Sequence, residues 1–296
     1  MSLLLFLQKL REFVNGQWNE LFLFVTAMGE STVTFLFLGF VYWCINKRTG
    51  LLMAANVGVT CTYSHVVKYL FKVQRPWIRN ANIRPLEKAL PNAGGYSFPS
   101  GHSARAGAVW GTFGVESYRN SKNLTFLVTG IVISLAVAFS RLFVGVHSVK
   151  DIIVGLLIAY TVCFAANFLL SWSEKGRNRS LLISAFLFLL CFVPMLKFGC
   201  ISTAGFGIGV SVSWLLEKRF LQFKDAENNI ERAERFIIGS IGIIIIRYWL
   251  SAFLGSFIPA RYCGFFMQFS MAFYILFFFP FLFVKIKKNW KLIALG

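Results

Sequence analysis

Long apolar runs are the feature that most limits what this chain can fold into. About 20 apolar residues suffice for a helix to cross the hydrocarbon core of a bilayer. The chain is 57% hydrophobic with a mean hydropathy of +0.65, which is not expected of a water-soluble globular domain. The predicted spans lie at about 21–46, 50–72, 101–118, 123–145, 147–172, 180–197, 199–217, 234–256 and 262–286.

The predicted fold class is therefore an all-α polytopic membrane protein, a helical bundle with about nine transmembrane helices. No internal repeat and no long linker divides the sequence, so we predict one membrane domain over residues 1–296. A core at about 21–172 would be followed by additional spans at about 180–286. Residues 2–14 have the pattern of a short amphipathic helix that lies in the membrane interface.

Basic residues in alternate loops predict the orientation. Short cytoplasmic loops carry an excess of Lys and Arg, which places these loops and the C-terminus in the cytoplasm and the N-terminus outside. These cytoplasmic anchors and an anion site account for the net charge of +18 better than a nucleic-acid partner does. The anchors are Lys47, Arg48, Arg119, Lys122, Lys175, Arg177 and Arg179, together with the basic residues of the 217–235 loop and of the tail.

The 73–100 loop, the 141–150 junction and the 257–261 turn, all on the outer side, carry basic residues against this bias, which suggests an anion site there. Three segments end on that side. The first contains Lys68 and, seven residues later, Arg75 followed by Pro76, which we expect to end the helix. Interfacial snorkelling is the alternative for these two basic side chains. The second is the Pro-Ser-Gly-His turn at 99–102, where backbone N–H groups at a helix start can bind an anion.

The third segment runs from Ser140-Arg141 to His147 and Asp151. Because His147 and Asp151 are four residues apart, they share one face of a helix. A carboxylate in this position can hold the imidazole N–H, fix its tautomer and raise its basicity. A simple hydrogen bond at a helix start is the alternative.

Together the three segments contain the groups that a phosphoryl transfer needs. Two histidines, His102 and His147, offer the roles of nucleophile and general acid. The sequence has no metal-ligand cluster and no Walker-type loop, so we predict no metal and no cofactor, with charge neutralised by basic side chains. The cationic donors are Lys68, Arg75 and Arg141, and the neutral donors are Ser100 and the N–H of Gly101.

In order and in internal spacing, these motifs resemble the signature of the type 2 phosphatidic acid phosphatase superfamily, over residues 68–151. The resemblance implies that His147 is the nucleophile and forms a phosphohistidine, with Asp151 orienting it. It implies that His102 protonates the leaving alcohol and then activates water. It also implies that the phosphoryl oxygens bind Lys68, Arg75, Ser100, Gly101 and Arg141.

The predicted topology is similar to those of glucose-6-phosphatase and the sphingosine-1-phosphate phosphatases. We therefore expect a metal-independent phosphatase acting on a lipid phosphate or diphosphate at the extracytoplasmic face. The substrate would be a phospholipid, a sphingoid phosphate or an isoprenoid phosphate in the bilayer. The alternatives are a sugar-phosphate phosphatase, a lipid phosphotransferase, and an anion transporter, which would be built of paired inverted halves.

Several residues outside the signature are also of interest. Arg105 and Trp77 are candidates for the substrate pocket, with headgroup contacts and the aromatic belt as the alternatives. Glu30 and Arg247 lie within apolar runs and should face the protein interior. They would pair with each other, or Arg247 would line the substrate cavity. The predicted spans allow Cys200 and Cys263 to lie near the outer surface, where a disulfide between them is an alternative to two free thiols.

Overall fold

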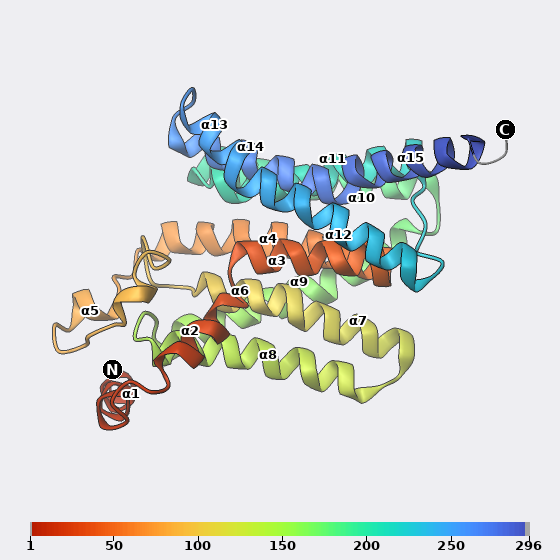
Figure 1. Ribbon diagram of the computed structural model, residues 1–296. Coiled ribbons are helices and arrows are strands. Elements are labelled where there is room, and N and C mark those ends of the chain that lie inside the picture. The colour runs from red at the N-terminus through yellow and green to blue at the C-terminus, as the bar shows by residue number, and fades with distance from the viewer. Residues whose placement is uncertain (1, 294–296) are drawn as a thin grey trace. The chain divides into compact units, whose positions relative to one another are not determined.

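The computed structural model describes residues 2–293, except for the side chains of residues 177, 251, 261 and 288–293. All regular elements in this range are helical, and none of its residues forms a β-strand (Figure 1). The all-α fold class is therefore confirmed. Most of the helices follow directly from the apolar runs, because a helix satisfies its own backbone hydrogen bonds where no water is present.

The chain is an integral membrane protein. By length and composition, five helices of residues 2–293 can cross a membrane, or six if Asn19–Ala27 and Ser31–Ile45 together form one span. The number of nine spans stays a prediction. The five helices are Leu124–Phe143, Val149–Ser173, Asn178–Phe198, Asn229–Gly255 and Tyr262–Lys287.

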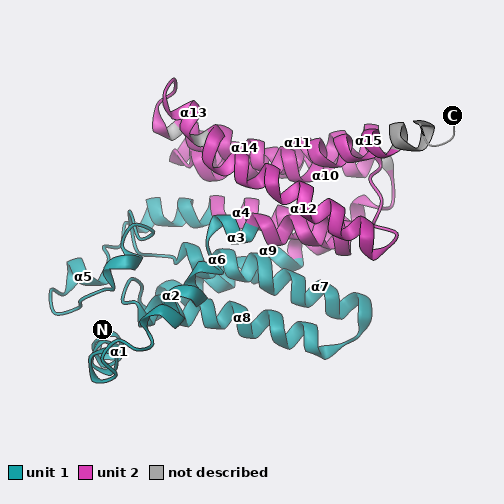
Figure 2. Cartoon of the chain, viewed as in Figure 1, with its two compact units in different colours: residues 1–34, 63–164 teal, residues 35–62, 165–296 magenta. Residues whose placement is uncertain are grey.

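The helices gather into two compact units (Figure 2). The first unit contains residues 1–34 and 63–164, and the second contains residues 35–62 and 165–296. All three sequence motifs fall in the first unit. The single membrane domain stays a prediction.

The first unit holds short helices, a long loop between residues 72 and 100, the whole of the long helix Leu124–Phe143 and parts of two other long helices. Three helices belong partly to the second unit, namely α3 (Ser31–Phe40), α4 (Lys47–Phe71) and α9 (Val149–Ser173). The remaining helices that place the site are α1 (Ser2–Phe13), α2 (Asn19–Ala27), α5 (Pro76–Arg79), α6 (Gly101–Ala106), α7 (Thr112–Ser121) and α8 (Leu124–Phe143). A short 3₁₀ turn, Glu87–Ala89, lies in the loop, and a π-helical turn, Gly107–Gly111, joins α6 to α7.

The span predicted at 21–46 is broken, because α2 ends at Ala27 and α3 begins at Ser31. A tight turn connects them, in which the N–H of Gly29 donates to the carbonyl of Thr26 at 3.0 Å. Gly29 packs so closely that an added Cβ would lie 3.1 Å from the carbonyl oxygen of His102 and 2.8 Å from Cγ1 of Val137. The break therefore lies against the start of α6.

The amphipathic helix predicted at 2–14 is present as α1, and its apolar face packs within the first unit. Leu4 and Leu7 are buried in a cluster with Ala138 and Leu142 of α8. Arg11 of the same helix is buried, and its Nη2 donates to the carbonyl of Arg84 at 2.5 Å. Helix α1 is thus tied both to α8 and to the loop that follows α5.

The second unit is built mainly from the C-terminal helices. Helix α11 packs tightly on α14, since an added Cβ at Gly205 would lie 2.5 Å from the carbonyl oxygen of Phe265. Such close approach of backbones is typical of small residues in membrane helices. Cys200 and Cys263 are both buried free thiols, so they form no disulfide. The helices of this unit are α10 (Arg177–Phe198), α11 (Ile201–Leu216), α12 (Asn229–Ile245), α13 (Ser251–Gly255), α14 (Ala260–Phe273) and α15 (Phe279–Ile293), with π-helical turns at Val41–Ile45, Glu217–Leu221, Ile246–Leu250 and Tyr274–Phe278.

Candidate active site

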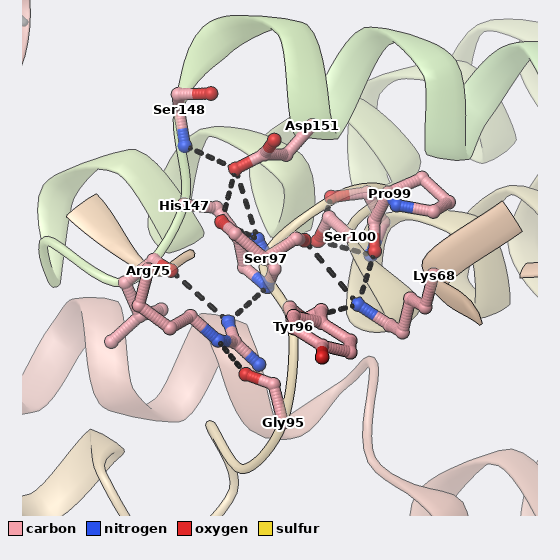
Figure 3. Close-up of polar contacts among 12 residues, drawn as sticks. Lys68, Arg75, Gly95, Tyr96, Ser97, Pro99, Ser100, His147, Ser148 and Asp151 are labelled. Atoms are coloured by element: carbon pink, nitrogen blue, oxygen red, sulfur yellow. Dashed lines mark hydrogen bonds and ion pairs between the residues drawn. The ribbon is translucent and has the colours of Figure 1, made fainter. Parts of the chain in front are cut away.

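The three sequence motifs meet in the first unit, where the loop before α6 lies between the other two (Figure 3). Lys68 lies in the last turn of α4, and Arg75 is the N-cap residue of α5. Pro76 was expected to end the preceding helix, but α4 already ends at Phe71 and Pro76 begins α5. The reason is that proline is well suited to the first turn of a helix, where its missing N–H would have no partner.

His147 and Asp151 are joined at the start of α9, as their spacing predicts. Nδ1 of His147 lies 3.3 Å from Oδ2 of Asp151, and both residues are buried. The same oxygen accepts hydrogen bonds from the N–H of Ser148 at 2.7 Å and from the hydroxyl of Ser97 at 2.6 Å (Figure 3). The carboxylate is therefore held in place by three donors, one of which is the imidazole.

Arg75 contacts the other nitrogen of the same ring. Its Nη1 lies 3.0 Å from Nε2 of His147 (Figure 3). A guanidinium is always a donor, so Nε2 is the acceptor in this contact and carries a lone pair. The proton of the neutral imidazole is then on Nδ1, facing Asp151. This is the tautomer that a nucleophile at Nε2 requires.

Burial and nearby charges favour the neutral form of this imidazole. Burial lowers the pKa of His147 to about 3, the hydrogen bond to Asp151 opposes the shift, and the positive charges of Arg75, Arg141 and Lys68 add to it. Burial also lowers the pKa of Arg75 to about 10, against the attraction of Asp151. At neutral pH the site therefore combines a neutral imidazole with a charged guanidinium.

Lys68 and Arg75 also hold the backbone of the loop before α6. Nζ of Lys68 donates to the carbonyls of Tyr96, Ser97 and Pro99, at 2.8, 3.3 and 2.6 Å. Nε of Arg75 donates to the carbonyl of Gly95 at 3.0 Å, and its Nη2 donates to the carbonyl of Gly94 at 2.7 Å. A phosphoryl oxygen bound by these two cations would have to share their hydrogen atoms with the loop.

The loop ends in the Pro-Ser-Gly-His turn that was singled out in the sequence. Ser100 is the N-cap of α6, where its hydroxyl oxygen accepts from the N–H of Ser103, and its own N–H donates to the carbonyl of Asp151 at 2.8 Å. An added Cβ at Gly101 would meet no described atom within 4 Å, so there is open space at the start of the helix. His102 is buried, and its Nε2 has no hydrogen-bond partner within the described residues.

Arg141 has free donors in the same unit. Its side chain is 1% exposed, and its Nη1 donates to the hydroxyl of Thr26 at 2.7 Å. Its Nε and Nη2 have no partner among the residues that the structure describes. Buried donors of a charged group without an acceptor are costly, so they mark a place where an anion would bind.

The candidates for the substrate pocket lie in different surroundings. Nη1 of Arg105 donates to the carbonyl of Gly29 at 2.8 Å, which ties α6 to the break between α2 and α3. The ring of Trp77 lies 5.7 Å from the guanidinium carbon of Arg75. Arg247 belongs to the second unit, where its Nη1 lies 3.4 Å from Sδ of Met267, and its place in a pocket stays a prediction.

Sequence reasoning missed two residues that contact the candidate site. Ser97, which bonds the carboxylate of Asp151, lies within the stretch that contains the Pro-Ser-Gly-His turn, two residues before Pro99. That position was the available signal. Thr26, the partner of Arg141, lies in an apolar run with no feature that distinguishes it. Its role depends on the break that brings α2 to the site.

Comparison with known proteins gives two matches to family profiles. The PAP2 superfamily matches residues 48–177, which include all three motifs. The transmembrane extension of PAP2 superfamily phosphatases matches residues 201–291. No solved structure matches the chain significantly.

Similar curated proteins cover about half of the chain. A probable sphingosine-1-phosphate phosphatase of Dictyostelium discoideum is 25% identical, over 57% of this chain and 42% of its own length. Phosphatidylglycerophosphatase B of Bacillus subtilis is 27% identical, over 49% of this chain and 72% of its own. Undecaprenyl-diphosphatase of Sulfolobus acidocaldarius is 27% identical, over 49% of this chain and 68% of its own. The chain thus spans less than half the length of the first of these relatives.

Proposed function

Because the chain belongs to the PAP2 superfamily, we propose that it is a membrane phosphatase that hydrolyses a lipid phosphate or diphosphate through a phosphohistidine intermediate. One observation carries this proposal: the buried His147 ring lies between Asp151 at Nδ1 and Arg75 at Nε2. This arrangement supplies a neutral imidazole whose lone pair adjoins a cationic donor. Phosphoryl transfer to nitrogen needs both groups together.

In the first step, Nη1 of Arg75 turns from the lone pair of His147 Nε2 to a phosphoryl oxygen. The lone pair then attacks phosphorus, and the bond from phosphorus to the alcohol oxygen breaks. His102, protonated on Nε2, gives its proton to the departing oxygen. Nε2 of His102 is buried and has no hydrogen-bond partner within the described part of the chain, which leaves it free to contact the departing oxygen. The proton on Nδ1 of His147 stays in its hydrogen bond to Asp151, which stabilises the positive charge that develops on the ring.

In the second step, the neutral His102 takes a proton from a water molecule as its oxygen attacks phosphorus. The bond between phosphorus and Nε2 breaks, inorganic phosphate leaves, and both histidines return to their starting protonation states. One side chain thus acts first as acid and then as base, because the second step reverses the bond changes of the first with water in place of the alcohol.

Charge on the phosphoryl oxygens is neutralised by basic side chains in this proposal. The Nε and Nη2 donors of Arg141, which have no acceptor among the described residues, are the best-supported contacts. The open space at Gly101 supports a contact with its backbone N–H. Lys68 and Arg75 would complete the set by sharing donors that now bond to backbone carbonyls. Ser100 would add its hydroxyl, whose oxygen accepts from the hydroxyl of Ser103 at 2.9 Å. Such preorganised donors supply the stabilisation that a metal ion supplies elsewhere.

The proposed site faces the extracytoplasmic side, with the C-terminus in the cytoplasm. The distribution of Lys and Arg supports this orientation, because alternate loops that carry no site motif hold clusters of basic residues. The names of three similar proteins contain a sphingoid phosphate, a glycerolipid phosphate and a polyprenyl diphosphate, which supports a lipid as the leaving group.

The test uses a phosphate ester with a good leaving group, such as 4-nitrophenyl phosphate, labelled with ³²P. The protein with His102→Ala should form an alkali-stable, acid-labile phosphoenzyme and turn over slowly, since departure of this leaving group needs no acid. The protein with His147→Ala should form no phosphoenzyme and lose activity by roughly 1,000-fold or more. Full turnover by His147→Ala would overturn the proposal.

A further inference from the structure

We propose that a polar cavity beside Arg141 recognises the leaving alcohol and, through the carboxylate of Glu30, selects alcohols that carry a positive charge near the phosphate. The substrate class is then the phosphate monoesters of amino alcohols, such as sphingoid-base phosphates. This inference rests on the proposed function, because it concerns the substrate of the same site.

The cavity lies entirely within the first unit and has a volume of about 230 Å³. It is formed by α2, the break before α3, the loop around Lys88, and α8. Its polar lining residues are Glu20, Thr26, Glu30, Lys88, Asn92 and Arg141. The arginine links the cavity to the proposed phosphoryl site.

One end of the cavity is suited to a phosphoryl group. Arg141 is buried, with 1% of its surface exposed, and its Nε and Nη2 have no acceptor within the described residues. A phosphoryl oxygen would satisfy both donors in the bidentate geometry that guanidinium groups favour. The alcohol part of the substrate would then extend into the remaining space.

The charges on the other walls do not cancel. At the rim, Lys88 and Glu20 form an ion pair at 2.5 Å, and both side chains are exposed. Glu30 instead accepts a hydrogen bond at 2.8 Å from Asn92, a neutral group. Once a phosphoryl group binds Arg141, the Glu30 carboxylate has no ion-pair partner among the residues that the structure describes.

Glu30 lines the same small cavity as Arg141, next to the turn that packs against the start of α6. It follows Gly29, which packs against the backbone of His102, the proposed acid at the departing oxygen. Gly29 also accepts the hydrogen bond from Arg105, which fixes the turn against α6. A group attached close to the ester oxygen would therefore lie near this carboxylate.

Electrostatics then discriminates between substrate classes. A carboxylate near a phosphate dianion repels it, and repulsion in a partly buried site is stronger than in water. An ammonium group close to the ester oxygen removes this penalty, whereas a second phosphate or an uncharged alcohol does not. The carboxylate thus weakens binding of diphosphates and of phosphate esters of uncharged alcohols, and it favours esters that carry an ammonium group.

The experiment compares two substrates that differ in one charge. Sphingosine 1-phosphate has a free ammonium group, and its N-acetylated derivative has the same chain, hydroxyl and phosphate without that charge. The selectivity is the ratio of the two kcat/KM values, measured in detergent for the wild-type protein and for Glu30→Gln, Glu30→Asp and Glu87→Gln. Glu87 is an exposed residue of the loop between α5 and α6, next to Lys88, and it does not line the cavity. Glu87→Gln is therefore the matched control.

We expect the wild type to prefer the ammonium substrate by roughly tenfold or more, and Glu30→Gln to lose this preference. Glu30→Asp should retain part of it, and Glu87→Gln all of it. Inhibition by orthovanadate, a probe of the phosphoryl site alone, should persist in Glu30→Gln and so establish that this variant is folded.

Equal turnover of both substrates by the wild type would overturn the inference, as would an equal loss of both in Glu30→Gln, which indicates a structural role for the bond to Asn92. Neither result contradicts the proposed function, because the protein would still hydrolyse phosphate esters. Absence of turnover of every phosphate ester would instead overturn the proposed function, and this inference with it.

Discussion

Nη1 of Arg75 lies 3.0 Å from Nε2 of His147, and this contact determines which nitrogen of the imidazole carries the proton. Since the guanidinium can only donate, the proton lies on Nδ1, 3.3 Å from the carboxylate of Asp151. The same arginine holds the loop before α6 through the carbonyls of Gly94 and Gly95. One side chain therefore couples the state of the candidate nucleophile to the position of the loop.

The protonation of His147 can be measured directly, because the chain has three histidines. With ¹⁵N-labelled histidine, the His147 signals should show the neutral form with the proton on Nδ1 across about pH 5 to pH 8. The pKa of about 3 predicts no titration in this range. His65→Gln and His102→Gln assign the three signals. A midpoint near the ordinary value, or a proton on Nε2, would contradict the tautomer.

The same shift in pKa predicts how acid affects stability. The folded-state pKa of His147 is about 3, below its ordinary value of 6.5. Between these values the unfolded chain binds the additional proton, so this residue makes the free energy of unfolding fall as the pH drops through that window. Thermal unfolding in detergent should show a smaller loss of stability on acidification in His147→Gln than in the wild type.

Replacement of Ser97 by alanine should slow the reaction without weakening substrate binding. The hydroxyl donates to Oδ2 of Asp151 at 2.6 Å, and a hydrogen bond to a charged group contributes about 1.5–3 kcal/mol. We therefore expect kcat to fall by roughly tenfold to a hundredfold, with KM unchanged and partial rescue by Ser97→Thr. Ser134→Ala, which removes a buried hydroxyl that bonds to the carbonyl of Gly130, is the control. An unchanged kcat in Ser97→Ala would exclude a positioning role.

Two glycines should respond differently to replacement by alanine. An added Cβ at Gly29 would lie 2.8 Å from Val137 and 3.1 Å from the carbonyl of His102, so Gly29→Ala should lower the melting temperature and the activity together. Overpacking of this kind costs about 1–3 kcal/mol. An added Cβ at Gly101 meets open space, so Gly101→Ala should melt like the wild type and yet lose activity, because the methyl group would occupy space proposed for the phosphoryl group. Full activity of Gly101→Ala would place the phosphoryl group elsewhere.

Chelators should leave the activity intact. In the proposed mechanism Lys68, Arg75 and Arg141 supply the positive charge for the phosphoryl oxygens, so no step depends on a divalent cation. Turnover should be unchanged after dialysis against EDTA. A strict requirement for an added metal ion would contradict the proposed mechanism.

The orientation of the site can be tested with impermeant thiol reagents. A cysteine introduced by Asn82→Cys, in the exposed part of the loop between α5 and α6, should be labelled from outside intact cells. Lys224→Cys, in the 217–235 loop, should be labelled only after the membrane is opened. The reverse pattern would invert the topology that the basic loops predict.

Much of this protein could be derived from local sequence patterns. Apolar runs predict helices because backbone groups in lipid must bond within their own segment. The spacing of His147 and Asp151 predicts their contact because one helical turn joins them, and the structure has that contact at 3.3 Å. Both inferences use only residues that are neighbours along the chain.

The tertiary structure decided the contacts between residues far apart in the sequence. The predicted first span is broken at Gly29, where the turn packs on His102, 73 positions away. The bonds from Ser97 to Asp151 and from Arg141 to Thr26 likewise join distant segments. The sequence by itself determined which chemical groups the site contains, since these are properties of single residues and short motifs. Which atoms of those groups face one another depends on packing between helices, and only the folded chain brings them together.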